Sequence, residues 1–193
     1  MIAIVKYNAG NIQSVRFALE RLGKEAIWTD DPEVLQSASH VIFPGVGEAS
    51  TAMHYLRERG LDTVISELKQ PVLGICLGLQ LFCAYSAEND TECMGIFNTD
   101  VRLFKSDTLK VPHIGWNNIT GLKGPLFNGI DENAWMYFVH SYYAVANELT
   151  QATCEYTLPF AASLQKDNFY AVQFHPEKSG QVGQQVIGNF LAL

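Results

Sequence analysis

The stretch that decides the fold is residues 71–80, which read Pro-Val-Leu-Gly-Ile-Cys-Leu-Gly-Leu-Gln. Apolar, β-branched residues lead into Cys76, and a run with helical character, residues 77–85, follows at once. A strand that becomes a helix within one residue crowds the backbone, so small residues are needed on both sides of the turn. Gly74 and Gly78 meet that need, and the pattern is that of a nucleophile elbow with cysteine in place of serine.

The elbow also sets the chemistry expected of Cys76. The residue would lie at the carboxyl end of a strand and at a helix N-terminus, where unpaired N–H groups favour a thiolate over a thiol. The alternative is a cysteine that only packs between a core strand and a core helix, because free cysteine is among the most buried residue types. A base and an oxyanion site elsewhere in the chain would favour the nucleophile.

The composition fits one compact domain, which we expect to span residues 1–193. The chain has 193 residues, and 48% of them are hydrophobic, enough for a sizeable core. The formal net charge is −7 and the basic residues are scattered, so nucleic acid is not an expected partner. No apolar run approaches the roughly 20 residues that span a bilayer, so no membrane contact is expected.

The cysteines and the first residues predict a cytoplasmic protein. The four cysteines show neither a Cys-x-x-Cys pairing nor metal-ligand spacing, so we expect reduced thiols and no metal site. Residues 1–5 begin directly as a strand and lack the charged segment and cleavage site of a signal peptide.

Strands and helices alternate through the first half of the chain. Predicted strands are residues 2–7, 26–29, 40–43 and 71–75. A turn is expected at residues 8–11, and the helix after it ends at Gly23. A second predicted helix begins at Asp31-Pro32, and a third helical region covers residues 49–68 with a break at Gly60. Alternation of this kind implies a parallel sheet with helices on both faces, and sites in such sheets form at the carboxyl ends of the strands.

The second half has a different pattern. Predicted strands are residues 101–104, 117–120, 135–145, 153–156, 161–165 and 170–174, and a final helix covers residues 183–191. We therefore expect more antiparallel pairing there, which either extends the same sheet or adds a small one.

His175 is the candidate base for Cys76. It ends a predicted strand and is followed by Pro176 and Glu177. Proline would hold the backbone extended on both sides, and residues two apart in an extended chain point to the same face. Glu177 could then fix the tautomer of the imidazole. The alternative is a histidine and a glutamate at a solvated strand end.

Residues 44–47, Pro-Gly-Val-Gly, are the candidate oxyanion loop, because they end the strand expected beside that of Cys76. Elbow enzymes take one N–H from the residue after the nucleophile, here Leu77, and another from a nearby loop. An ordinary strand-to-helix turn also uses glycine and proline. Gln80, one helical turn after Cys76, could bind a substrate amino acid or be a polar residue at a helix start.

Together these motifs resemble the class I (triad) glutamine amidotransferases and, among them, the glutaminase subunits of imidazole glycerol phosphate synthase. The resemblance covers the whole chain and its motifs occur in the same order. They are residues 7–11, 44–47, 74–80, 113–117, 139–143, 174–177 and 178–180. The family implies an α/β, flavodoxin-like fold, with a central mostly parallel sheet flanked by helices and antiparallel strands in the second half.

The resemblance also implies an activity that needs no cofactor. Cys76 would attack the side-chain amide of glutamine, His175 would carry the proton, and Glu177 would orient His175. The matching positions for glutamine and the oxyanion are Gly45, Val46, Gly47, Leu77, Gln80, Glu88, Ser141 and Tyr142.

A partner chain is implied as well. In the family, ammonia passes to a (β/α)8-barrel cyclase subunit in a heterodimer, which makes imidazole glycerol phosphate and aminoimidazole carboxamide ribonucleotide in histidine biosynthesis. The matching interface positions are Asn11, Trp116, Tyr137 and Lys178. Aromatic residues are enriched at interfaces, although burial in the core is an equal alternative for Trp116.

Two other functions stay open from the sequence alone. One is a glutaminase that serves another pathway, such as pyridoxal phosphate, anthranilate or guanylate synthesis. The other is a flavodoxin-like binding or scaffold protein in which Cys76 only packs, and whose cysteines would all react slowly with iodoacetamide.

Overall fold

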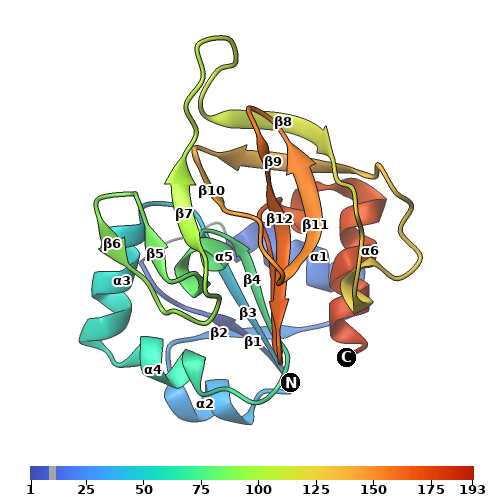
Figure 1. Cartoon of the computed structure of the whole chain (residues 1–193). Coiled ribbons are helices and arrows are strands. Elements are labelled where there is room, and N and C mark those ends of the chain that lie inside the picture. Colours follow the sequence, from blue (N-terminus) through green and yellow to red (C-terminus); the bar gives the residue numbers. More distant parts are fainter. Residues whose placement is uncertain (9–11) are drawn as a thin grey trace.

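The structure is a computed structural model that describes residues 1–8 and 12–193. Its centre is a seven-stranded sheet (Figure 1). The strands lie in the order β11 (Thr150–Glu155), β12 (Pro159–Lys166), β13 (Phe169–Val172), β4 (Val72–Cys76), β3 (His40–Gly45), β1 (Ile2–Val5) and β2 (Ala26–Thr29). The five strands from β13 to β2 are parallel, and β12 and β11 add antiparallel pairs at one edge. The predicted α/β fold with a mostly parallel central sheet is confirmed.

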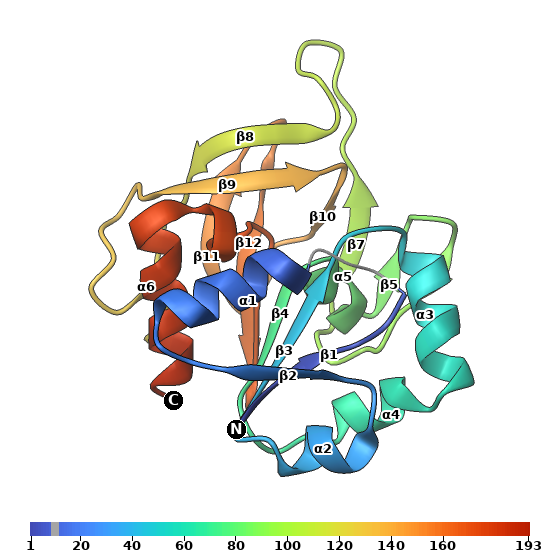
Figure 2. The same cartoon turned by 180° about the vertical axis from the view of Figure 1, so that it is seen from behind.

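Helices cover both faces of this sheet (Figures 1 and 2). One face packs against α1 (Ile12–Arg21) and α6 (Gly180–Leu191). The other packs against α2 (Pro32–Ser37), α3 (Ala49–Glu58), α4 (Leu61–Ser66) and α5 (Leu77–Phe82). The sequence of β1 is continuously apolar because the strand is buried on both faces. Ile2 and Ile4 point into one core layer, while Ala3 and Val5 point into the other.

Two smaller sheets come from the second half of the chain. An antiparallel ribbon, β8 (His113–Asn118) with β9 (Trp135–His140), lies across the top of the central sheet in Figure 1. A four-stranded sheet has the order β10 (Tyr142–Ala144), β7 (Asp100–Leu103), β5 (Tyr85–Ser86) and β6 (Thr91–Glu92). The second half therefore both extends the central sheet and adds new ones. Among the described residues, no helix has the length and apolarity needed to cross a membrane.

Several local predictions are confirmed because short-range chemistry decides them. Strand 26–29 is found as predicted. Asp31 caps α2, its carboxylate accepting from the Glu33 N–H at 2.9 Å. Gly60, at φ 65°, separates α3 from α4. Residues 9–11 of the predicted turn, including the predicted interface residue Asn11, lie outside the described residues.

Other boundaries differ where distant strands pair. The helix after Cys76 ends at Phe82, short of the predicted residue 85, because Tyr85 and Ser86 pair with β7. The predicted strand 135–145 divides at Ser141, since its first part pairs with β8 and its second with β7. The predicted strand 117–120 begins earlier, at His113, where pairing with β9 begins. The paired residues lie well apart in the sequence, so the local pattern does not reveal them.

Gly78 lies where α5 packs closely against β3. A Cβ there would collide with the backbone carbonyl oxygen of Phe43. We expect Gly78→Ala to lower the free energy of unfolding, measured by urea denaturation, by about 1–3 kcal/mol through overpacking. Gly188→Ala is the matched control, because α6 leaves open space around Gly188 and alanine is the better helix former. Equal stability of the two variants would contradict this account.

Candidate active site

Cys76 occupies the turn that its sequence predicts. It is the last residue of β4 and the residue before α5, with φ 53° and ψ −105°. A positive φ is strained for a residue with a Cβ, and such strain persists only where the surroundings hold it. Here β4 and α5 are buried along their whole length, so the turn cannot relax. The sulfur is held at the carboxyl edge of the central sheet.

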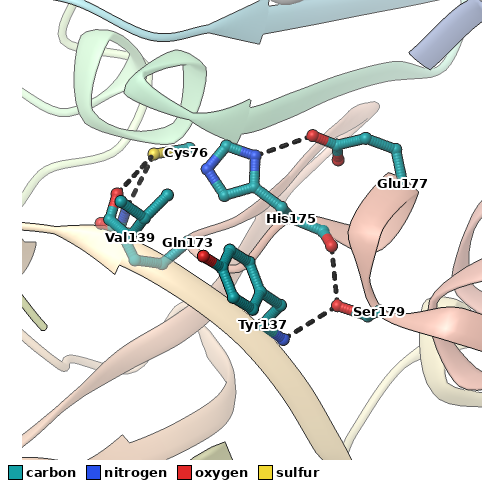
Figure 3. A network of polar contacts seen from close by, with 7 residues as sticks. All are labelled: Cys76, Tyr137, Val139, Gln173, His175, Glu177 and Ser179. Atoms are coloured by element: carbon teal, nitrogen blue, oxygen red, sulfur yellow. Dashed lines mark hydrogen bonds and ion pairs between the residues drawn. The ribbon is translucent and has the colours of Figure 1, made fainter. Parts of the chain in front are cut away.

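His175 and Glu177 form a buried pair beside Cys76 (Figure 3). His175 Nδ1 lies 2.8 Å from Glu177 Oε1, and each side chain is only 3% exposed. The predicted proximity is right, but the predicted reason is wrong. The backbone is not extended after Pro176; Pro176–Lys178 forms a 3-10 turn that folds the carboxylate back onto the ring.

The backbone around His175 is anchored to the ribbon. The His175 N–H donates to the Tyr137 carbonyl at 2.9 Å. Ser179 Oγ donates to the His175 carbonyl at 2.7 Å and accepts from the Tyr137 N–H at 3.0 Å (Figure 3). These bonds fix the imidazole relative to β9, and so relative to the wall of the site.

The free edge of the His175 ring faces Cys76 (Figure 3). Its Nε2 is buried and has no hydrogen-bond partner within residues 1–8 and 12–193. Burial alone would lower the pKa of His175, but the Cys76 sulfur and the Glu177 carboxylate raise it to about 10. The ring is therefore suited to take the thiol proton and hold it as an imidazolium next to a thiolate.

A cavity of about 340 Å³ opens in front of Cys76. This is within the range of small-molecule sites, about 300–1,000 Å³. It brings together all the predicted glutamine and oxyanion positions except Gly45: Val46, Gly47, Leu77, Gln80, Glu88, Ser141 and Tyr142. Gly45 pairs with Cys76 in the sheet, so it lies at the base of the predicted oxyanion loop rather than in the cavity wall.

Two of these residues are held by hydrogen bonds within the protein. Gln80 is buried, and its Nε2 donates to the Tyr142 carbonyl at 3.0 Å and to Gln173 Oε1 at 3.1 Å. Glu88 Oε2 accepts from the Ala49 N–H at 2.7 Å. Burial raises the pKa of Glu88, although that N–H bond opposes the shift.

Gln173 is a site residue that sequence analysis missed. It is fully buried just after β13, and its Nε2 lies 3.6 Å from the sulfur of Cys76. The Val139 carbonyl lies 3.9 Å from the same sulfur. The only signal in the sequence was the position of Gln173 two residues before His175, on the same strand end.

A buried histidine pair was also missed. His113 Nδ1 lies 3.2 Å from His140 Nε2, and His140 Nδ1 lies 2.7 Å from the Tyr142 carbonyl. Since a carbonyl only accepts, Nδ1 of His140 carries the proton and its Nε2 accepts from His113. Burial lowers the pKa of His113 to about 4 and that of His140 to about 3, so both rings are neutral at pH 7.

The described members of the predicted interface gather on the outside of the ribbon. Trp116 is 53% exposed, so the alternative of core burial is wrong for it. Its ring centroid lies 6.0 Å from that of Tyr137, and Lys178 Nζ lies 6.0 Å from the Tyr137 ring. We call Ile114, Trp116, Trp135 and Tyr137 the outer ribbon face. Exposed apolar side chains that gather on one face, as Ile114, Trp116 and Trp135 do, are typical of an interaction site.

Comparisons with known proteins agree with this geometry. Residues 7–193 match the protein family described as Glutamine amidotransferase class-I. The chain is 57% identical over 194 residues to the imidazole glycerol phosphate synthase subunit HisH of Bacteroides fragilis, covering 100% of this chain and 99% of that protein. The subunit of the same name from Bacteroides thetaiotaomicron is 55% identical over 194 residues, with the same coverage.

A solved structure of a glutamine amidotransferase has the same fold. It superposes with a TM-score of 0.75 at 18% identity, covering 100% of this chain and 98% of that chain. At that identity the likeness concerns the fold alone.

The histidine pair predicts a loss of stability in acid. Unfolded histidine has a pKa of about 6.5, whereas His113 and His140 hold values of about 4 and 3. At a pH between the unfolded and folded pKa values, the unfolded chain binds more protons than the folded protein does. The free energy of unfolding should therefore fall as the pH drops from about 6.5 towards 4. Urea denaturation at a series of pH values measures this slope.

The matched variants are His113→Phe and His54→Asn. Phenylalanine keeps the stacking on Phe138 and Tyr156 but removes one proton-binding ring, so the slope below pH 6.5 should be shallower. His54→Asn, on the exposed surface of α3, should keep the parental slope. A His113→Phe slope as steep as the parent's would show that the pair is not the cause.

Proposed function

The chain belongs to the class I glutamine amidotransferases, and we propose that it is the glutaminase subunit of an imidazole glycerol phosphate synthase. The observation that carries the proposal is Cys76, which opens on the cavity, with the buried pair of His175 and Glu177 beside it. The chain that holds this arrangement is 57% identical over its full length to a protein of that name. We further infer that residues 1–193 form one glutamine amidotransferase domain.

The chemistry follows from the order of the three side chains. The thiol proton of Cys76 passes to His175 Nε2, and the sulfur attacks the side-chain carbonyl carbon of glutamine. His175 returns the proton to the leaving nitrogen, which departs as ammonia and leaves a glutamyl thioester. Water, deprotonated by His175, then hydrolyses the thioester to glutamate. Glu177 keeps Nδ1 protonated, so that Nε2 is the atom that exchanges protons.

The cavity residues divide into two groups in this proposal. Backbone N–H groups of Leu77 and of residues 45–47 stabilise the oxyanion formed during attack. Gln80, Glu88, Ser141 and Tyr142 hold the amino-acid end of glutamine. The carboxylate of Glu88 suits the ammonium group, and Gln80 offers its Oε1 because its Nε2 is used within the protein.

Ammonia is proposed to pass to a partner rather than to solvent. The relatives are named as subunits of a synthase, which implies a second subunit. We propose a (β/α)8-barrel cyclase that docks on Trp116, Tyr137 and Lys178, with Asn11 at the same interface. It would use the ammonia, with a phosphoribulosyl-formimino aminoimidazole carboxamide ribonucleotide, to make imidazole glycerol phosphate and aminoimidazole carboxamide ribonucleotide. We expect the pair to work in the cytoplasm.

The first test is glutamate release from glutamine, measured for this chain alone and then with the cyclase and its nucleotide ligand. We expect low activity that rises strongly in the complex. Activity that ignores the cyclase would keep the triad chemistry but remove the histidine-pathway assignment. No release in either setting would reject the glutaminase.

Cys76→Ala is the variant that completes this test. It should abolish glutamine-dependent synthesis in the complex but leave synthesis from added ammonium salts intact, because only the ammonia supply is lost. Loss of both activities would mean that Cys76 matters for assembly rather than for chemistry.

A second prediction concerns the partner surface. Trp116→Ala should weaken binding of the cyclase by about 2 kcal/mol, roughly thirtyfold in Kd, because exposed tryptophans are frequent binding hot spots. Trp28→Ala is the matched control, since Trp28 is 48% exposed on the edge strand β2 at the other side of the sheet. Titration calorimetry measures the Kd of the cyclase for each variant. Equal affinities for the two variants would remove Trp116 from the interface.

A further inference from the structure

We propose that the side-chain amide of Gln173 is a catalytic hydrogen-bond donor that stabilises the thiolate of Cys76. We further propose that Gln80 and the His113–His140 pair act as positioning residues, which hold the amide in the donating orientation. The proposal rests on the role of Cys76 as the nucleophile proposed above.

The sulfur has two hydrogen-bonding neighbours with opposite preferences. The Val139 carbonyl, 3.9 Å from Sγ, can only accept, so it suits the S–H form of the side chain. The Gln173 Nε2, 3.6 Å from Sγ, can only donate, so it suits the thiolate. Once the proton has moved to His175, the contact with Gln173 gains strength because its acceptor carries a charge.

The orientation of the Gln173 amide is fixed from outside. Gln80 must present its NH2 group to the Tyr142 carbonyl, since a carbonyl cannot donate. The same Nε2 lies 3.1 Å from the Gln173 side chain, so the atom of Gln173 that faces it is the oxygen. The NH2 of Gln173 therefore points at the sulfur. A reversed amide would set two donors against each other and turn an oxygen towards the thiolate.

The histidine pair extends this order beyond Tyr142, and His140 itself also lines the cavity. The Tyr142 carbonyl also accepts from His140 Nδ1 at 2.7 Å, and His140 Nε2 accepts from His113. Gln80 Nε2 therefore donates to both the Tyr142 carbonyl and Gln173 Oε1, while His140 Nδ1 donates to the Tyr142 carbonyl. In the hydrogen-bond network that runs from His113 to Cys76, every donor and acceptor assignment is therefore consistent with the others.

The position of Gln173 argues against a role in substrate binding. It is fully buried, does not line the cavity, and its backbone N–H is used by the Ala162 carbonyl at 2.9 Å. A neutral amide supplies a donor without adding a charge that would compete with the His175 imidazolium.

The ionisable groups around the sulfur have other tasks. His175 receives the proton, with Glu177 behind it. Tyr7 is buried; burial and the nearby Cys76 raise its pKa, and its hydroxyl donates to the Pro44 carbonyl of β3 at 2.7 Å. Glu88 stands in the cavity wall and is bonded to the Ala49 N–H. Among the side chains that the structure describes, Gln173 is the neutral donor that directly contacts Sγ.

The test is the pH profile of alkylation of Cys76 by iodoacetamide, measured by peptide mass spectrometry in the full chain. Burial raises the pKa of the other three thiols, so they react slowly and each peptide is assigned separately. Gln173→Met keeps the length of the side chain but removes the donor. We expect its profile to move to higher pH, with alkylation at pH 7 about tenfold slower.

Two further variants separate this effect from a loss of stability. Ser163→Ala removes a buried donor from the neighbouring strand, where Ser163 Oγ bonds the Ala171 carbonyl at 2.8 Å, and should keep the parental profile. Gln173→Glu keeps an acceptor for Gln80 and turns a carboxylate to the sulfur, so it should move the profile to higher pH even if the methionine variant fails to fold. A folded Gln173 variant whose profile overlays the parent's would overturn the proposal.

Glutamine turnover distinguishes this inference from the proposed function. In the complex, Gln173→Met should lower kcat with little change in KM, because the residue does not line the cavity. A shifted alkylation profile in a chain that releases no glutamate would reject the proposed function alone. Normal glutamate release with an unshifted profile would reject only the role of Gln173.

Discussion

The close packing of α5 against β3 is the constraint on which the site depends. No side chain fits at Gly78, because the Phe43 carbonyl occupies the place of a Cβ. The chain also passes directly from β4 into α5, and Cys76, at the junction, is held at φ 53°. Its sulfur stays at the edge of the sheet where β13 also ends, so the side chains after β13 come within reach of it.

Cys76 lies between two kinds of polar environment. On one side, the pair His175 and Glu177 stabilises charge, and the pKa of His175 is raised. On the other side, Gln173, Gln80 and the histidine pair are neutral and joined by hydrogen bonds in a fixed direction. Burial alone would disfavour charge on both sides. The Cys76 sulfur and the Glu177 carboxylate together outweigh that effect at His175.

The β8–β9 ribbon connects this site to the surface. Side chains alternate across its two faces, as strand geometry requires. His113 and His140 pack inward on the aromatic core, while Trp116 and Tyr137 lie on the outer ribbon face. The Val139 carbonyl contacts the sulfur, and the His175 N–H bonds to Tyr137. A movement of the ribbon would therefore reach both Cys76 and His175.

The sequence by itself determined the features that depend on near neighbours. The glycines around Cys76, the Asp31 cap and the break at Gly60 are decided within a few residues, and the order of strands and helices implied a parallel sheet. Its motifs also pointed to Cys76, His175 and Glu177 as the candidate triad. Only the tertiary structure decided that Gln173 contacts the sulfur, that Glu177 reaches its partner through a 3-10 turn, and that residues 135–145 divide between two sheets. The contact of Gln173 and the division of residues 135–145 depend on pairing or packing with residues far away in the chain, which local periodicity does not encode. The turn at residues 176–178 is local, but its backbone is anchored by Tyr137 through His175 and Ser179.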